Sequence, residues 1–260
     1  MRVAALQFAA TTDVGDNIAT IGGLIEQAPD ADLVVAPEAA MHDFGKPDLP
    51  LGPVAQDVDG PFVAALAARA RAIRATIVAG MFEKSADENR PYNTLVALGP
   101  DGDLLATYRK VHLYDSFGYR ESDRLLPGDP DPVTLKVGDL VVGLMTCYDL
   151  RFPEYARLLV DAGADALAVP AAWVRGPLKE DHWETLLRAR AIEHTAYVIA
   201  AAQTGPAYSG SSMVVDPMGV AIARLGDETG VATADVTLDR LREVRQRNPS
   251  LANRRLPAVR

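Results

Sequence analysis

The chain has 260 residues, of which 48% are hydrophobic and 23% charged, the balance expected of a globular protein with an ample core. Acidic residues outnumber basic ones by 35 to 26, for a net charge of −9, which argues against a nucleic-acid partner because phosphates require a basic face. No apolar run is as long as a membrane span, and the first residues read as a strand rather than a signal peptide, so we expect no membrane partner and a cytoplasmic location.

The chain contains a single cysteine, Cys147, which excludes an intrachain disulfide and leaves its thiol available for chemistry. The four histidines include no pair at metal-ligand spacing, and there is no cysteine cluster, so we expect no metal site. Neither a glycine-rich phosphate loop nor a dinucleotide fingerprint follows the first strand. The sequence therefore predicts a protein that works without a cofactor.

Predicted strands and helices alternate along the chain, without a linker or a shift in composition. Apolar runs predict strands at 1–8, 33–36, 76–82, 92–98, 104–108, 141–146, 166–170, 197–201, 212–215, 221–225 and 231–236. Helical spacing and start signals predict helices at 18–28, 59–73, 154–160, 183–191 and 238–244. The stretch 111–132 has little periodicity, and irregular segments of this length are usually functional. We expect one α/β domain over 1–260, folded as a layered sandwich.

Three predicted strands end close to a residue that can take part in chemistry: Glu38, Lys110 and Cys147. Taken singly, each has an ordinary explanation, since Glu and Lys are mostly solvated and a free Cys is often a small buried hydrophobe. Their joint appearance is harder to dismiss. Because the carboxyl ends of parallel strands in one sheet meet at the same edge, we expect the three side chains to share one crevice.

These three residue types suit an attack on an amide carbonyl. Glu38 can accept the proton of the Cys147 thiol, which turns the sulfur into a nucleophile. Lys110 and the backbone N–H of Tyr148 can stabilise the oxyanion that forms. A carboxyl group that cycles between its two forms can then protonate the leaving nitrogen and activate water against the thioester.

Three segments resemble the signatures of the nitrilase superfamily of carbon–nitrogen hydrolases: Ala-Pro-Glu at 36–38, Tyr-Arg-Lys-Val-His-Leu-Tyr-Asp at 108–115 and Cys-Tyr-Asp-Leu-Arg-Phe-Pro-Glu at 147–154. The resemblance implies Glu38 as general base, Lys110 as oxyanion stabiliser and Cys147 as nucleophile. It also implies that Glu121 is a fourth catalytic carboxylate. The implied fold is a four-layer α-β-β-α sandwich that pairs with a second copy, and the irregular tail at 248–260 is expected to lie in oligomer contacts.

The segment at 147–154, with His-Trp-Glu at 182–184, looks like the ω-amidase and deaminated-glutathione amidase branch. We therefore expect a thiol amidohydrolase that cleaves a small primary amide to a carboxylic acid and ammonia. Hydrolysis of an N-carbamoyl amino acid or of a nitrile stays open, although true nitrilases usually place Trp where this chain has Tyr148. A binding or scaffold protein that keeps the fold is the non-enzyme alternative.

Candidate substrate-binding residues lie near the same strand ends. Tyr148 follows the cysteine, and Trp173 follows the strand at 166–170. The Cys147-Tyr148 pair resembles that of amidases that act on small amides with a carboxylate at the far end. Such a carboxylate requires a nearby cation when it is buried. Arg175 is the first candidate for that cation and Arg120 the second, because an arginine can pair with a carboxylate through two hydrogen bonds. His112 is expected to hold the loop after Lys110.

Overall fold

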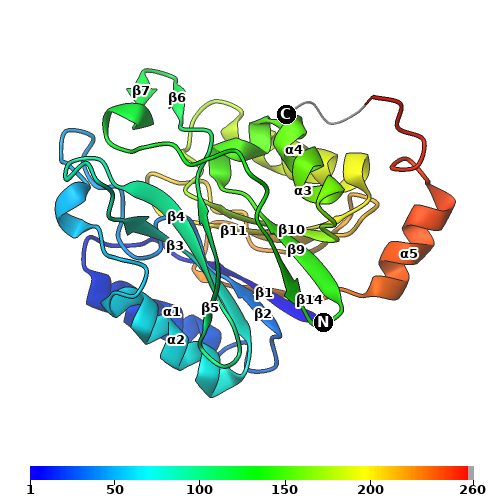
Figure 1. Ribbon diagram of the computed structural model, residues 1–260, viewed down its shortest axis with the longest axis horizontal. Coiled ribbons are helices and arrows are strands. Elements are labelled where there is room, and N and C mark those ends of the chain that lie inside the picture. Colours follow the sequence, from blue (N-terminus) through cyan, green and yellow to red (C-terminus); the bar gives the residue numbers. More distant parts are fainter. Residues whose placement is uncertain (257–260) are drawn as a thin grey trace.

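Figure 1 shows the computed structural model, which describes residues 1–256 and contains two six-stranded sheets. The first sheet has the order β14-β1-β2-β3-β4-β5, with bounds Gly230–Asp235, Arg2–Gln7, Leu33–Val35, Thr76–Glu83, Tyr92–Leu98 and Leu104–Arg109. The second has the order β13-β12-β11-β10-β9-β8, with bounds Ala221–Arg224, Met213–Val215, Tyr197–Ala202, Ala166–Ala171, Leu140–Leu144 and Thr134–Val137. The central strands β1, β2 and β3 run parallel, as do β9, β10 and β11.

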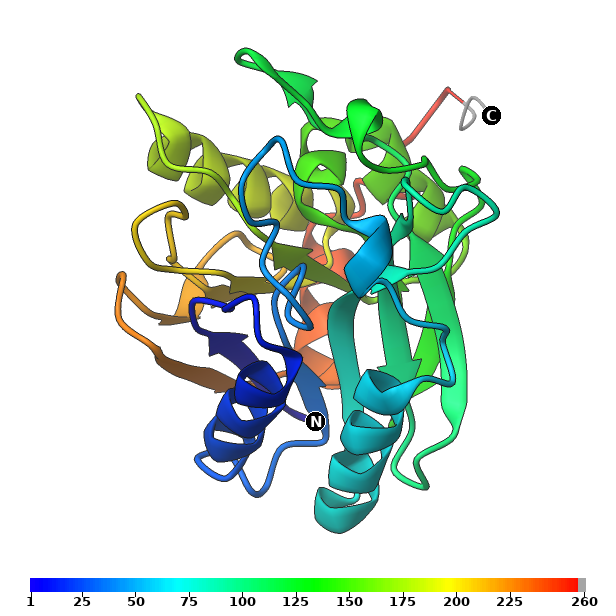
Figure 2. The same cartoon turned by 90° about the vertical axis from the view of Figure 1, so that its left-hand side faces the viewer.

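The sheets lie face to face between two pairs of helices, as Figures 1 and 2 show. Helices α1 (Val14–Ile25) and α2 (Pro61–Ile73) contact the first sheet, and α3 (Pro153–Asp161) and α4 (Lys179–His194) contact the second. The predicted α-β-β-α sandwich is therefore confirmed. Helix α5 (Leu238–Arg247) follows β14 at one end of the molecule. No helix within residues 1–256 is long and apolar enough to cross a membrane.

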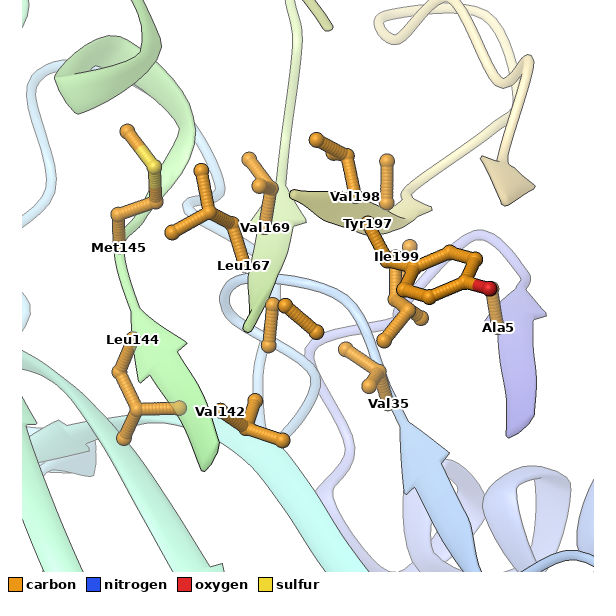
Figure 3. Close-up of a cluster of buried hydrophobic side chains, with 14 of the residues drawn as sticks. Ala5, Val35, Val142, Leu144, Met145, Leu167, Val169, Tyr197, Val198 and Ile199 are labelled. Carbon is orange, nitrogen blue, oxygen red and sulfur yellow. The ribbon is translucent and has the colours of Figure 1, made fainter. Parts of the chain in front are cut away.

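Strand β1 illustrates how the sequence makes these layers. Val3 and Ala5 belong to the core cluster that includes the second sheet, whereas Ala4 and Leu6 belong to the cluster with α1 and α2. Successive side chains of a strand point to opposite faces, so a strand buried on both faces reads as a continuous apolar run. Figure 3 shows Ala5 in the first of these clusters, together with Val35 of β2 and Ile199 of β11.

Local signals set several helix ends. Asp13 caps α1, its side chain accepting from the backbone N–H of Asp16 at 2.9 Å. Pro61 occupies the start of α2, where its missing N–H costs no hydrogen bond. Arg74 ends α2 in the left-handed region at φ 55°, the conformation that commonly ends a helix.

Two predicted segments differ from the structure. The irregular stretch 111–132 contains a small hairpin, β6 (Asp115–Ser116) with β7 (Tyr119–Arg120), and a 3-10 turn at Glu121–Asp123. The strand leading to Cys147 is preceded by a second strand, β8, which pairs with β9 as an antiparallel hairpin. Periodicity misses both because the strands of the small hairpin have two residues each and β8 has four.

The chain after α5 turns back toward α3, where Arg254 pairs with Asp161 at 2.5 Å. Leu251 packs against the core cluster from the same segment. The expected role of the tail at 248–260 in oligomer contacts stays a prediction, and its last residues, 257–260, lie outside the described part of the chain.

Candidate active site

The three predicted strand-end residues meet in one cavity of about 490 Å³. Glu38 follows β2 and Lys110 follows β5, both in the first sheet, whereas Cys147 follows β9 in the second. The expectation that one sheet supplies all three was therefore wrong. The carboxyl ends of β2 and β5 in the first sheet and of β9 in the second all face this cavity. Glu121 reaches the same cavity from the 3-10 turn after β7.

Glu38 is held between the two sheets and is 1% exposed. One carboxylate oxygen accepts from Asn93 Nδ2 at 2.7 Å, and the other accepts from the backbone N–H of Ala172, at the end of β10, at 2.6 Å. Gln203 Nε2 donates to the Glu38 carbonyl at 2.9 Å. Gly80 of β3 leaves room for this approach, since a Cβ there would lie 2.7 Å from Glu38 Cα. The carboxylate is fixed before any substrate arrives.

Lys110 is 1% exposed and lies between two carboxylates. Its Nζ donates to Glu38 Oε1 at 2.8 Å and to Glu121 Oε2 at 2.9 Å. Burial by itself lowers the pKa of Lys110, but the charges of Glu121 and Glu38 outweigh it and raise that pKa well above its ordinary value. The ammonium is therefore a permanent positive charge at the cavity floor.

Glu121 is a buried carboxylate whose pKa is raised above its ordinary value. Burial raises the pKa of Glu121, Lys110 opposes that rise, and the charge of Glu38 adds to it. The backbone N–H of Tyr114 donates to Glu121 Oε2 at 2.6 Å, which fixes the side chain against the loop after β5. Two buried carboxylates around one cation can exchange a proton with a reacting group without leaving their places.

Cys147 begins a 3-10 turn and adopts φ 46°, the left-handed region that L side chains rarely occupy. Such strain costs on the order of 1–3 kcal/mol and is found at functional sites. Burial and then the charge of Glu38 raise the pKa of the Cys147 thiol well above its ordinary value, although Lys110 lowers it. The resting sulfur is therefore a thiol, and it needs a neighbouring base to become a nucleophile.

Asp149 organises the turn that carries Cys147. Its carboxylate accepts from the Thr146 N–H at 2.8 Å and from the Tyr108 hydroxyl at 2.5 Å. It also accepts from the backbone N–H of His112 at 3.0 Å and contacts His112 Nδ1 at 2.8 Å. The His112 ring stacks on Phe152, with centroids 3.8 Å apart. His112 thus holds the loop after Lys110 to the turn at Cys147, as expected.

Of the four candidate substrate-binding residues, three line the cavity and one does not. Tyr148, Trp173 and Arg175 all line it. Trp173 is 2% exposed, and its Nε1 donates to the Lys179 carbonyl at 2.7 Å. The side chain of Arg175 is 41% exposed and faces Asp227 at 3.7 Å. Arg120 is 69% exposed, pairs with Asp123 at 3.5 Å and is not among the lining residues.

Sequence reasoning missed two side chains that line this cavity, Tyr114 and Lys179, and a third, Asn93, that contacts Glu38. Asn93 orients Glu38, Tyr114 forms part of the wall, and Lys179 contributes a buried ammonium from the start of α4. Asn93 and Lys179 belong to common surface types, and only the fold reveals that they point inward. Tyr114 lies within the motif at 108–115, which was the available signal. Within residues 1–256, no cluster of three or more His, Cys, Asp or Glu side chains could hold a metal ion.

Residues 2–246 match the family model for carbon–nitrogen hydrolases. The chain is 43% identical to a deaminated glutathione amidase from Escherichia coli O157:H7 over 98% of this chain and 97% of that protein. It is 35% identical to a deaminated glutathione amidase from Bos taurus, over 97% of this chain and 81% of the relative. The crystal structure of XC1258, a CN-hydrolase superfamily protein from Xanthomonas campestris, superposes with a TM-score of 0.90 at 28% identity, covering 100% of this chain and 99% of that one.

The chain belongs to the carbon–nitrogen hydrolase family. It is a hydrolase of carbon–nitrogen bonds other than peptide bonds. Within that class it is an amidase that acts through a catalytic cysteine.

Proposed function

We propose that Cys147 is the nucleophile of this amidase, with Glu38 as its base. Glu38 takes the thiol proton as the sulfur attacks the amide carbon, and the carbonyl oxygen becomes an oxyanion. Lys110 and the backbone N–H of Tyr148 stabilise that oxyanion. As the tetrahedral intermediate collapses, the carbon–nitrogen bond breaks and Glu38 returns the proton to the leaving nitrogen.

Glu121 takes part in the second half of the proposed cycle. Water adds to the thioester carbon after giving a proton to the carboxylate pair, and the carbon–sulfur bond then breaks. The proton passes back to sulfur, which restores the thiol and releases the acid. The observation that carries the proposal is the position of Lys110 Nζ, 2.8 Å from Glu38 and 2.9 Å from Glu121 in the cavity that also exposes Cys147.

A small primary amide is the first substrate class we propose, with release of ammonia. The names of the relatives, both deaminated glutathione amidases, add deaminated peptides as a second class. Tyr148 and Trp173 provide apolar walls for either substrate. N-carbamoyl amino acids and nitriles remain the enzyme alternatives, and a scaffold role is disfavoured by the shared membership of an amidase family.

The test is a product-release screen over ω-amides, deaminated peptides, N-carbamoyl amino acids and nitriles. Cys147→Ala should lose at least about 10³-fold in kcat for the best substrate, because no covalent intermediate can form. Glu38→Gln should lose a comparable factor, whereas its matched control Glu88→Gln changes an exposed carboxylate and should retain full activity. Substantial turnover by Cys147→Ala would refute the assignment of the nucleophile.

A homodimer or larger homo-oligomer in the cytoplasm is part of this proposal. The free thiol of Cys147 suits a reducing compartment. Sedimentation at micromolar concentration should show at least twice the chain mass of 27.8 kDa. A monomer under those conditions would contradict the oligomer. Unchanged assembly after deletion of the tail at 248–260 would contradict the expected role of the tail in oligomer contacts.

A further inference from the structure

Lys179 is a buried ammonium for which the described chain provides no carboxylate partner. The residue is 5% exposed, and none of the ion pairs found within residues 1–256 includes it. Its Nζ has one hydrogen-bond partner, the Tyr114 hydroxyl, at 3.3 Å. A buried cation normally lies beside a carboxylate, because removal of its charge from water is costly.

Aromatic rings surround this ammonium. Nζ lies 4.9 Å from the ring centre of Tyr114, 4.9 Å from that of Trp173 and 5.0 Å from that of Phe117. Cation–π attraction to ring faces compensates part of a charge but leaves its N–H groups free to donate. Burial, followed by the charge of Arg151, lowers the pKa of Lys179. An anion beside Nζ would relieve both effects.

Four cationic side chains line the cavity in the described chain, and three of them are already engaged. Lys110 lies between two carboxylates, and Arg175 faces Asp227 while its Nε donates to the Tyr208 carbonyl at 2.7 Å. Arg124 donates to two backbone carbonyls and to the Tyr119 hydroxyl. Lys179 is therefore the lining cation with the most unused donor capacity.

We propose that Lys179 is the residue that binds the carboxylate of an acidic amide, and that it thereby sets the preference for acidic over neutral amides of the same length. This inference rests on the proposed function, because the scissile carbonyl is placed at Cys147 in the same cavity. Tyr114 orients the ammonium and Trp173 covers the apolar chain between the two ends of the substrate. Arg175 is the rival anchor, and the experiment compares the two.

The experiment measures kcat and KM for glutaramate and for pentanamide, a neutral amide of the same chain length. Lys179→Met should lose about ten- to a hundredfold in kcat/KM for glutaramate, mainly through KM, as expected for a lost hydrogen bond between charged groups. Its loss on pentanamide should stay below about threefold. Lys179→Arg should keep part of the preference for glutaramate, since the charge is retained. The carbonyl of residue 179 that accepts from Trp173 is backbone and survives both changes.

Lys136→Met, at an exposed lysine of β8, is the matched control and should change kcat/KM for either amide less than about threefold. Arg175→Met tests the rival anchor and should lose less than about threefold on both amides if Lys179 holds the carboxylate, since the charge of Arg175 already faces Asp227. Equal losses of Lys179→Met on the two amides would overturn the proposal, because they would mark Lys179 as structural. A loss specific to glutaramate in Arg175→Met but not in Lys179→Met would assign the carboxylate to Arg175. A wild type that prefers pentanamide would also overturn it.

Binding of glutarate, measured by calorimetry, separates this inference from the proposed function. Glutarate has no amide, so its binding requires no turnover. Its Kd should rise about ten- to a hundredfold in Lys179→Met and change little in Arg175→Met. If the wild type hydrolyses neither amide, the proposed function fails for these substrates, and the glutarate affinities still decide on Lys179. Equal Kd values in the wild type and Lys179→Met would overturn the binding of the carboxylate by Lys179.

Discussion

Replacement of Asp149 by Asn should lower both the free energy of unfolding and kcat. The Asp149 carboxylate is fully buried, and one of its oxygens accepts from Tyr108 and from the Thr146 N–H. An amide group can accept through one oxygen only, so its NH₂ would face either this pair of donors or the pair from His112. Two hydrogen bonds to a charged group are worth about 1.5–3 kcal/mol each, which gives a loss of about 3–6 kcal/mol.

Thermal unfolding followed by calorimetry or circular dichroism measures this loss. At about 2–4 °C per kcal/mol for a chain of this size, Tm should fall by on the order of 10 °C. Tyr108→Phe removes one donor and should cost about 1.5–3 kcal/mol. Asp123→Asn, at a carboxylate that is 66% exposed, is the matched control and should stay within about 0.5 kcal/mol of the wild type.

The same substitution should lower kcat about ten- to a hundredfold. Asp149 joins two segments of the site, the turn that contains Cys147 and the loop that follows Lys110. KM should change much less, since Asp149 is not among the residues that line the cavity. A variant with the Tm and the kcat of the wild type would refute the view that this carboxylate organises the site.

Three further predictions concern other buried groups. Burial lowers the pKa of His194 from 6.5 to about 4. Below pH 6.5 the unfolded chain therefore binds a proton that the folded chain does not, so the free energy of unfolding should be largest above pH 6.5 and fall by about 3 kcal/mol toward pH 4. His194→Gln should reduce this pH dependence in denaturant titrations. Glu121→Gln should accumulate more acyl-enzyme than the wild type in quenched samples, and an unchanged amount would contradict its role with water. Gly80→Ala places a Cβ 2.6 Å from the backbone N of Ala39 and should lower both stability, by about 1–3 kcal/mol, and kcat, with normal values arguing against the close packing at Glu38.

The sequence predicts the layers well because each buried strand carries its own signal. The runs at Leu33–Val35 and Ala166–Ala171 are apolar on both faces, which fits parallel strands covered by helices on one side and a second sheet on the other. The assignment of strands to sheets could not be predicted in the same way. Apolar runs do not tell which neighbour they pair with, so Glu38 and Cys147 were placed in one sheet although they belong to two.

The sequence likewise predicts some residues of the candidate site and not others. Glu38, Lys110 and Cys147 could be named because strand ends and motif spacing mark them, and the structure brings them into one cavity. Lys179 could not, because a Lys at the start of a helix is usually solvated, and its burial depends on Tyr114 and Phe117 from a distant segment of the chain. The interactions of a long side chain follow from tertiary packing, which the sequence does not display.

The central claim is that an acyl group passes through Cys147, and intact-mass measurement of rapidly quenched enzyme tests it most directly. With glutaramate as substrate, the wild type and Glu121→Gln should show a transient gain of one glutaryl group, while Cys147→Ala shows none. Hydroxylamine should remove the group, as expected for a thioester, and the chain offers one thiol to carry it. Turnover without any adduct in either enzyme, or the same adduct on Cys147→Ala, would contradict the account.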